Sequence, residues 1–380
     1  MVVVTGVGAV CALGDDADTV FRAVCRGETG IRSPVDVPGD PAVRSWPVAR
    51  VGWAGRPTGT ALALRVVAEA LAEAGLTDSE GLAVVGASTA GDMVLGEVAF
   101  GQHVRREPID APADYLWTQL CHRPTREVAD AIGATGPVTT ASTACTSGAT
   151  AIGIAADWVR SGRVRRAIAF GTDALCGTTT AGFASLGLHS RVGCRPFDDA
   201  RDGMCLGEGA AALVLEREDD AVARGARPLA RLLGYGVAQD AHHLSTPEPS
   251  GAGAIRAMRA ALAAAGVDPA DLGYVNAHGT GTLLNDAMEG VALGQVAPNA
   301  PVSSTKGATG HTLGAAGALE AALVIRALRD GLLPPNVGLG RSGIPLELVR
   351  VARPARIDLA MSVNFAFGGH NTALIFGRAA

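Results

Sequence analysis

The sequence predicts an α/β fold built from two related halves. Short apolar, β-branched runs alternate with Ala-rich stretches that have the length of helices. Continuous apolar runs between helices are typical of strands that are buried on both faces of a sheet. In addition, residues 70–91 resemble residues 261–281, and residues 207–216 resemble residues 368–377. The shared order of helix, turn, strand and glycine loop indicates a duplicated unit.

The predicted elements follow in order along the chain. We expect strands at 2–5, 82–86, 166–171, 210–216, 274–277, 302–304 and 372–376, and helices at 59–74, 148–161, 253–265 and 314–330. The charged stretch 217–227 separates the similar segments, which gives an N-terminal half, 1–220, and a C-terminal half, 221–380. No low-complexity linker lies between them, so we expect one compact unit with its chemistry between the halves.

Composition narrows the class of function. Hydrophobic residues make up 48% of the 380 residues, charged residues make up 18%, and the net charge is -5. No basic run occurs, so nucleic-acid binding is disfavoured. No apolar run is long enough to cross a bilayer. The apolar start, 1–10, lacks a basic region and a cleavage site, and it predicts a buried strand. The seven cysteines contain no CxxC pair, so a disulfide framework and a zinc site are disfavoured. We therefore expect a reducing cytoplasm as the setting of this chain.

The first candidate for chemistry is Cys145, in the segment TACTSGA. Strand or loop character precedes it, and an apolar helix with small residues follows it. Unpaired N–H groups at a helix N-terminus stabilise a thiolate, so this position predicts a lowered cysteine pKa and a nucleophile for thioesters. The alternative is a buried, inert cysteine.

Two histidines follow strands and open glycine-rich loops. His278 lies in NAHGTGT, where Thr280 and Thr282 supply hydroxyls that could hold an amide chain, and His311 lies in STKGATGHTLG. The alternative for His278 is a turn histidine satisfied by backbone. Because the two histidines come from different loops and no HxxxH spacing occurs, a zinc site is disfavoured.

Lys306 is the only lysine among 32 lysine and arginine residues. A compact ammonium differs from a planar guanidinium, so this position predicts a point charge in a tight space. A surface lysine in a loop is the alternative.

Near the C-terminus, NFAFGGHN combines two phenylalanines with a glycine turn whose free N–H groups could stabilise an oxyanion. Ordinary core packing is the alternative there, and His370 reads as structural.

Taken together, these segments resemble the β-ketoacyl synthases of fatty-acid and polyketide synthesis. Further matches are CRPFDDARDGMCLGEGAAALVLE, at 194–216, and DAHHLSTPEPSGAG, at 240–253. The ordered set spans nearly the whole chain. The resemblance implies a thiolase fold, which is a duplicated αβαβα architecture in five layers. It also implies an acyltransferase that joins an acyl group to a malonyl unit with loss of carbon dioxide.

The resemblance also implies roles for single residues. Cys145 would accept the acyl group, and His278 and His311 would stabilise the enolate of the malonyl thioester. Backbone N–H groups of Cys145 and Phe367 would form the oxyanion hole, and Lys306 would pair with Glu289. Substrate contacts would come from Thr280, Thr282, Phe365, Gly368 and Asp240, the last three in segments that look like the family's gating loops.

Partners are implied in the same way. The substrate carrier is an acyl carrier protein, whose phosphopantetheine arm replaces any cofactor of the enzyme itself. We expect exposed arginines near the entrance, Arg195 among them, to dock this acidic protein. The family works as dimers, so we expect a homodimer or a heterodimer with a chain-length-factor-like subunit.

Some positions depart from the family pattern. Leu283 replaces the proline that often follows HGTGT, and the segments 92–136 and 188–195 are short. FGTDALC and CRPFD look like ketosynthases of polyene-forming type II polyketide systems. Two rivals stay open: a non-catalytic chain-length-factor-like subunit, which lacks the nucleophile, and a non-decarboxylating acyltransferase or thiolase. The set of Cys145 and two histidines disfavours both.

Overall fold

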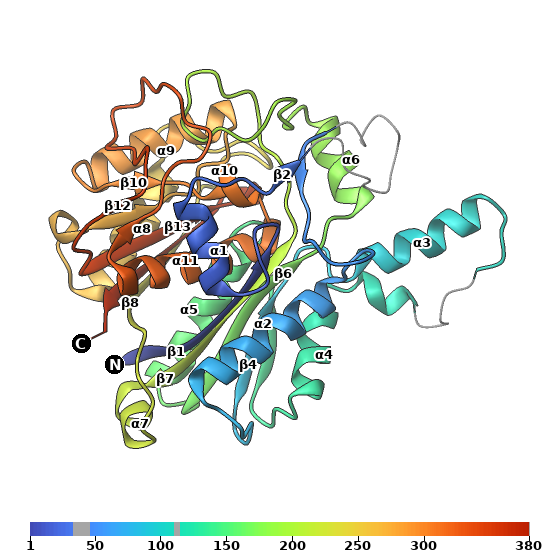
Figure 1. Cartoon of the computed structure of the whole chain (residues 1–380), viewed down its shortest axis with the longest axis horizontal. Coiled ribbons are helices and arrows are strands. Elements are labelled where there is room, and N and C mark those ends of the chain that lie inside the picture. The colour runs from blue at the N-terminus through green and yellow to red at the C-terminus, as the bar shows by residue number, and fades with distance from the viewer. Residues whose placement is uncertain (33–45, 110–114, 380) are drawn as a thin grey trace.

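One mixed sheet runs through the molecule (Figure 1). The computed structural model describes residues 1–32, 46–109 and 115–379. The strands of this sheet are β1 (Val2–Cys11), β4 (Ala83–Ala87), β5 (Val138–Ala141), β6 (Arg166–Asp173), β7 (Gly209–Arg217), β8 (Ala230–Gln239), β9 (Tyr274–Asn276), β10 (Val302–Ser303), β13 (Leu359–Phe365) and β14 (His370–Arg378). Their spatial order is β10-β9-β13-β14-β8-β1-β7-β6-β4-β5.

The two halves of this sheet repeat one topology. From the centre outward, the first half runs β1-β7-β6-β4-β5 and the second runs β8-β14-β13-β9-β10. In each half, the three strands nearest the centre pair antiparallel with one another, namely β1-β7-β6 and β8-β14-β13. The two outer strands of each half join this group by parallel pairing. The halves join where β1 pairs antiparallel with β8. The repeated strand order is that of a duplicated unit, while the boundary at residue 220 stays a prediction.

Helices separate and cover the two halves of the sheet. These helices are α2 (Gly59–Ala74), α4 (Arg123–Ala131), α5 (Ser147–Arg160), α8 (Ala252–Ala265), α9 (Leu283–Val296) and α11 (Ala316–Asp330). In the middle, α5 and α11 pack on each other and contact strands of both halves. Outside them, α2 and α4 cover the first half, and α8, with α9 against it, covers the second. The result is an arrangement of five layers. Because α11 lies in the middle layer with α5, it is buried from Ala316 to Leu328.

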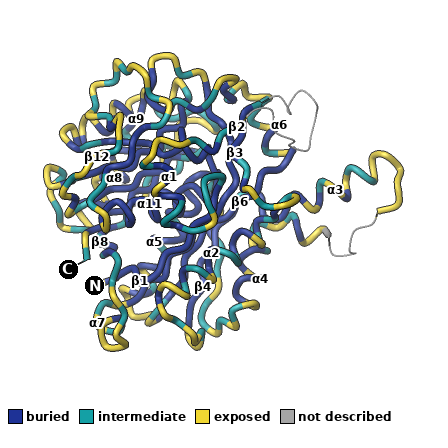
Figure 2. The backbone as a smooth tube through the Cα atoms, in the orientation of Figure 1, coloured by how far each residue is buried: buried dark blue, intermediate teal, exposed yellow. Residues whose placement is uncertain are grey.

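An arm extends from this body (Figures 1 and 2). It contains α3 (Met93–Val104) and the short helix η1 (Tyr115–Gln119), which pack on each other. The remaining elements are α1 (Ala17–Cys25), α6 (Gly177–Ser185), α7 (Glu218–Ala223), α10 (Lys306–Thr309), η2 (Pro269–Asp271), η3 (Leu313–Ala315), η4 (Phe367–Gly369), β2 (Ile31–Arg32), β3 (Val48–Ala49), β11 (Leu332–Leu333) and β12 (Arg353–Pro354).

All seven predicted strands and all four predicted helices are present, and the α/β class is confirmed. The charged stretch between the halves forms α7. Three strands of the sheet are not among the seven predicted ones: β5, whose segment has strand or loop character in the sequence, β8 and β13. In β8, Gly234 and Gly236 weaken the strand pattern. They are required because an added Cβ would lie 2.1 Å and 2.2 Å from backbone oxygens of α8.

Candidate active site

Cys145 lies in a tight turn between β5 and α5. The side chain of Ser147 closes this turn, because its hydroxyl accepts from the Thr143 N–H and donates to the Ala144 carbonyl. Ala144 has a φ of 50°, a left-handed conformation that is rare for a residue with a side chain. Such strain persists only where the surroundings fix it, and it is concentrated at functional sites. The predicted strand-to-helix junction is confirmed.

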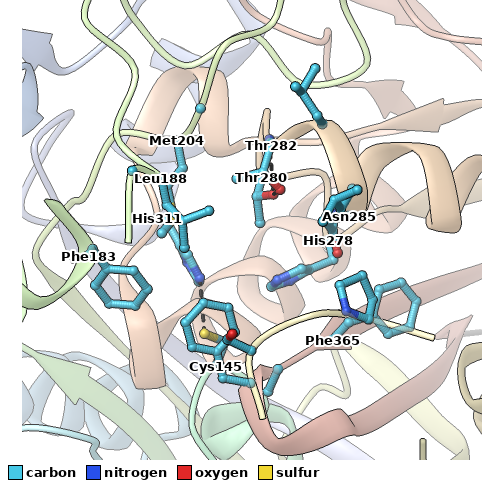
Figure 3. A pocket seen from close by; sticks show the side chains of 18 of the residues that line it. Cys145, Phe183, Leu188, Met204, His278, Thr280, Thr282, Asn285, His311 and Phe365 are labelled. Carbon is cyan, nitrogen blue, oxygen red and sulfur yellow. Dashed lines mark hydrogen bonds between the residues drawn. The ribbon is translucent and has the colours of Figure 1, made fainter. Parts of the chain in front are cut away.

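Both predicted histidines meet Cys145 in one cavity (Figure 3). His311 points its Nε2 at the sulfur of Cys145, at 3.2 Å. The imidazole rings of His278 and His311 stand edge to face, with centroids 5.3 Å apart. All three residues are buried and line a cavity of about 280 Å³. Residues far apart in the sequence therefore form one cluster of a thiol and two imidazoles.

Lys306 lies behind His278, buried to 1% exposure. Its ammonium donates to the His278 carbonyl at 2.6 Å and contacts the Glu320 carboxylate, and it lies 3.3 Å from His278 Nδ1. These three partners match the three N–H donors of an ammonium. If Nδ1 accepts from Lys306, the ring proton of neutral His278 is on Nε2. The unique lysine is thus a buried point charge, as predicted.

The family resemblance implies Glu289 as the partner of Lys306, and this prediction is wrong. The salt bridge of Lys306 is with Glu320 on α11, and Glu320 also accepts from the Asn364 side chain at 2.6 Å. Glu289 instead accepts the backbone N–H groups of His278 and Gly279, both at 2.7 Å. It therefore holds the loop that carries His278, and it does not neutralise the lysine directly.

The loop after His278 is held by carboxylates of α9. Asp286 accepts the N–H groups of Thr280 and Gly281, next to the contacts of Glu289. This leaves the Thr280 and Thr282 hydroxyls at the cavity, where they lie 2.9 Å from each other. Burial raises the pKa of Glu289 to about 8. The two threonines lie where the sequence predicts contact with a substrate arm.

Two further predicted segments close the cavity. Phe365, Phe367 and Asp240 line it, while Gly368 does not. The Gly368 N–H instead donates to the Leu244 carbonyl at 2.7 Å, and the Asp240 N–H donates to the Gly369 carbonyl at 2.8 Å. These bonds join the loop after β8 to the loop after β13, so the two loops predicted to gate the pocket are in contact.

The thiol of Cys145 is not acidic in this setting. Burial raises its pKa to about 12, although the charge of Lys306 acts in the opposite direction. The pKa lowering predicted from the helix N-terminus is therefore wrong, because loss of water around the sulfur is the larger effect. Burial, followed by Lys306, also lowers the pKa of both His278 and His311 well below the usual value. At neutral pH the cluster is a thiol beside two neutral imidazoles.

Comparison with known proteins identifies the family. Residues 58–221 match the β-ketoacyl synthase N-terminal domain, and residues 229–340 match the β-ketoacyl synthase C-terminal domain. The chain is 34% identical to 3-oxoacyl-[acyl-carrier-protein] synthase 2 of Staphylococcus aureus (strain COL), across 99% of this chain and 98% of that protein. The chain belongs to the β-ketoacyl synthase family.

Solved structures agree with this family assignment. The ishigamide ketosynthase/chain length factor is 29% identical and superimposes with a TM-score of 0.92, covering 100% of this chain and 99% of the other. The ketosynthase ApeO in complex with its chain length factor ApeC, from Xenorhabdus doucetiae, is 32% identical with a TM-score of 0.84, covering 100% and 98%. The predicted thiolase fold and the predicted activity class, β-ketoacyl synthesis by acyl transfer in fatty-acid or type II polyketide elongation, are confirmed.

Several residues of this β-ketoacyl synthase's site are not predicted from the sequence. Phe183, Leu188 and Met204 add apolar lining, and the ring of Phe183 lies 5.6 Å from that of Phe367. Glu320 supports Lys306 from an Ala-rich helix that offers no local signal for a charge partner. Leu283, where the family often has proline, is the first residue of α9, a position at which a missing N–H costs nothing.

The described residues of this β-ketoacyl synthase show neither a metal site nor a membrane-spanning helix. Across residues 1–32, 46–109 and 115–379, no three or more metal-binding side chains gather as they would around an ion. No helix in the same ranges is long and apolar enough to cross a membrane.

Arg195, predicted to dock a carrier protein, contacts the Ala200 carbonyl and Asp202, which itself lines the cavity. Its docking role stays a prediction.

Proposed function

We propose that this chain catalyses decarboxylative condensation of an acyl group with a malonyl unit, with Cys145 as the nucleophile. One observation carries the proposal: His311 Nε2 lies 3.2 Å from the Cys145 sulfur, and His278 faces the same cavity. One imidazole is placed to take the thiol proton, and the pair is placed to donate to one oxygen.

The first step is transfer of the acyl group to Cys145. The sulfur attacks the carbonyl carbon of an acyl thioester, and its proton passes through His311 to the departing phosphopantetheine sulfur. The C–S bond to the carrier breaks as the bond to Cys145 forms. Because His311 has a lowered pKa, it holds the proton only in transit. This balances as one thioester and one thiol before and after the step.

The second step uses both imidazoles as donors. The malonyl thioester oxygen accepts from His278 and His311 while the bond to the carboxylate breaks and carbon dioxide leaves. The electron pair left behind forms an enolate, which attacks the acyl carbon on Cys145. The sulfur then leaves as a thiolate and takes one proton from solvent. Neutral imidazoles suit this step because they donate without first having to be charged.

Other residues would hold the reacting groups. We assign the N–H groups of Cys145 and Phe367 to the oxyanion of the acyl intermediate, and Thr280 and Thr282 to the amides of the phosphopantetheine arm. That arm belongs to the acyl carrier protein, so the chemistry requires no cofactor of the enzyme. The charge that develops lies on oxygen, and hydrogen-bond donors are sufficient to stabilise it.

The arm and the edge strand β5 point to a second subunit. Phe100 and Trp117 on the arm are 66% and 61% exposed, and Val138 on β5 is exposed too. A soluble monomer rarely presents such a cluster, and an unpaired edge strand is a pairing site. We propose that a second thiolase-fold subunit covers this surface. The structures of ApeO with ApeC and of the ishigamide ketosynthase/chain length factor support a chain-length-factor-like partner.

The pathway and compartment are part of the same proposal. We place the chain in a polyene-forming type II polyketide system, supported by the FGTDALC and CRPFD motifs and by the ketosynthase neighbours with chain length factors. We place it in the cytoplasm, because five of its seven free cysteines are buried thiols that a reducing compartment preserves.

Condensation itself tests the proposal. The purified chain is incubated with an octanoyl-loaded acyl carrier protein and a malonyl-loaded one, alone and with a candidate chain length factor, and products on the carrier are identified by mass spectrometry. We expect a β-ketoacyl product that the Cys145→Ala variant does not form. Cys25→Ala, at a half-buried cysteine away from the cavity, is the matched control. Product formation by Cys145→Ala would contradict the assigned nucleophile.

The same assay separates the rivals. A non-catalytic partner subunit would form no product and release no carbon dioxide from the malonyl carrier. A non-decarboxylating transferase would acquire the acyl group without releasing carbon dioxide. The proposed enzyme both acquires the acyl group and releases carbon dioxide. The Cys145→Ala variant still releases carbon dioxide because His278 and His311 remain.

A further inference from the structure

Asp173 is a buried carboxylate that joins two segments on either side of the active site. It is the last residue of β6, with 0% exposure, and it does not line the cavity. Its oxygens accept from the N–H groups of Thr89, Ala90 and Gly314 and from the hydroxyls of Ser88 and Thr89. All of these contacts are donors and favour an ionised carboxylate, whereas burial acts in the opposite direction and raises the pKa of Asp173.

One side of this junction is the turn that follows His311. The Gly314 N–H donates to Asp173 at 2.7 Å. Leu313, which lies between His311 and Gly314 in the sequence, has a φ of 52°, a left-handed conformation. Its side chain packs in the apolar cluster with Met204 and Leu206. An extra Cβ on Gly314 would lie 2.7 Å from Asp173 Oδ2. The turn is therefore held in a strained shape by its packing and by this carboxylate.

Among the described residues, His311 makes hydrogen bonds through its backbone and its Nε2 contacts Cys145, while its ring packs edge to face on His278. Its N–H donates to the Cys205 carbonyl, and its carbonyl accepts from Gly207. Its Nδ1 is buried and has no hydrogen-bond partner within the described residues. No side chain of residues 1–32, 46–109 or 115–379 hydrogen-bonds the ring at Nδ1, in contrast to His278, whose Nδ1 lies beside Lys306. The position of the His311 ring thus depends on the segment on each side of it, and Asp173 anchors one of these.

The other side of the junction is the turn after β4, which leads into the arm. Thr89 contacts Asp173 through its N–H at 3.0 Å and through its hydroxyl at 2.6 Å, and Ser88 through its hydroxyl at 2.7 Å. Four residues beyond Thr89, Met93 begins α3. Asp173 therefore ties the His311 turn to the base of the arm.

We propose that Asp173 is a positioning residue for His311. It fastens the turn after His311 and so sets Nε2 at its distance from the Cys145 sulfur. An asparagine cannot replace it, because an amide –NH₂ would face N–H donors on one side or the other. Since both acyl transfer and decarboxylation use His311, loss of this anchor slows both steps. Neither the Thr280–Thr282 pair nor the gating loops contact Asp173, so carrier binding is retained. The inference rests on the function proposed above.

Asp173→Asn tests this role through rate constants. Two quantities are measured: the single-turnover rate of acyl transfer to Cys145, by intact mass from an octanoyl carrier, and kcat and KM for carbon dioxide release from a malonyl carrier. We expect both rates to fall about 10- to 100-fold, the usual effect of small misplacement of a reacting group, with KM unchanged. The acylation endpoint stays complete, because folded molecules still react.

Asp198→Asn is the matched control. Asp198 is also a buried aspartate that accepts three backbone N–H groups, from Ala200, Gly340 and Arg341, and it does not line the cavity. We expect a loss of thermal stability in both variants but a loss of rate only in Asp173→Asn. Wild-type rates in Asp173→Asn, or a loss confined to the acylation endpoint or to KM, would overturn the proposal.

A second pair of variants applies if Asp173→Asn does not fold. Gly314→Ala displaces the carboxylate from the His311 turn and also crowds the Thr89 N–H, whereas Thr89→Val removes one donor on the arm side and leaves Gly314 unchanged. The proposal requires slower acylation in Gly314→Ala than in Thr89→Val, and equal rates overturn it. If the wild-type chain performs neither reaction, the proposed function fails. Crystal structures of wild type and Gly314→Ala then decide: an unchanged distance between His311 Nε2 and Cys145 Sγ would refute the positioning role.

Discussion

The ammonium of Lys306 lies 3.3 Å from Nδ1 of His278 and 2.6 Å from its backbone oxygen. One buried charge thus fixes both the ring and the main chain of a histidine that faces the cavity. Its third contact, the Glu320 carboxylate, comes from the central helix α11. With Nδ1 accepting from Lys306, the ring proton lies on Nε2, from which this ring can donate to a thioester oxygen.

Lys306→Arg is expected to lose activity although the charge is kept. A planar guanidinium cannot place three donors around one point, and the site is 1% exposed, so no room exists for a longer side chain. We expect carbon dioxide release to fall on the order of 10- to 100-fold. Arg329→Lys, at a partly exposed position, is the control. Full activity of Lys306→Arg would make the ammonium geometry irrelevant.

A double-mutant cycle separates the two carboxylates near Lys306. Residues in direct contact couple, whereas separate contacts add. Lys306→Met combined with Glu320→Gln should show a coupling energy of about 0.5–3 kcal/mol in unfolding experiments. The same lysine variant combined with Glu289→Gln should be closer to additive, because Glu289 binds backbone N–H groups. Stronger coupling to Glu289 would restore the pairing expected from the family resemblance.

The pH dependence of decarboxylation reports the charge on the two imidazoles. Burial and Lys306 lower the pKa of both His278 and His311, so both rings are neutral as pH falls through about 6.5, where a free histidine gains its proton. Carbon dioxide release by Cys145→Ala, in which the active-site thiol is absent, should therefore be flat between about pH 7 and 6, below the range in which Glu289, with its pKa of about 8, gains its proton. A rate that rises as pH falls across this range would indicate an imidazolium donor instead.

The arm provides a test of the second subunit. Burying a phenylalanine side chain contributes about 1.5–3 kcal/mol, so Phe100→Asp should weaken association roughly 10- to 100-fold. Light scattering after size-exclusion chromatography, with and without a candidate chain length factor, measures the change. Val222→Asp, at an exposed valine on α7, controls for the added charge. An unchanged assembly in Phe100→Asp would remove the arm from the interface.

Much of the site could be predicted because its residues lie in local motifs. Cys145, His278 and His311 each sit beside a glycine or small-residue loop that follows or precedes a regular element. The family resemblance adds the pairing of Thr280 and Thr282 with a substrate arm. That Cys145, His278 and His311 meet in one cavity depends on the duplicated sheet, whose two halves pack around α5 and α11.

What could not be predicted depends on three-dimensional contacts. Glu320 reads as an ordinary charge on an Ala-rich helix, and only the burial of α11 on every side makes it the partner of Lys306. Asp173 ends an apolar strand, and nothing in the sequence shows that Gly314 will lie against it. The lowered pKa predicted for Cys145 is wrong because the sequence shows the helix N-terminus but not the burial of the sulfur.

The most direct test of the central claim is intact-mass and peptide mass spectrometry of the chain after exposure to an octanoyl-loaded acyl carrier protein, with the proposed partner subunit supplied. The account predicts one octanoyl adduct, located on the peptide that contains Cys145, which disappears when a malonyl carrier is added as a β-ketoacyl carrier forms. An adduct on any other residue, or one that the malonyl carrier does not discharge, would contradict it.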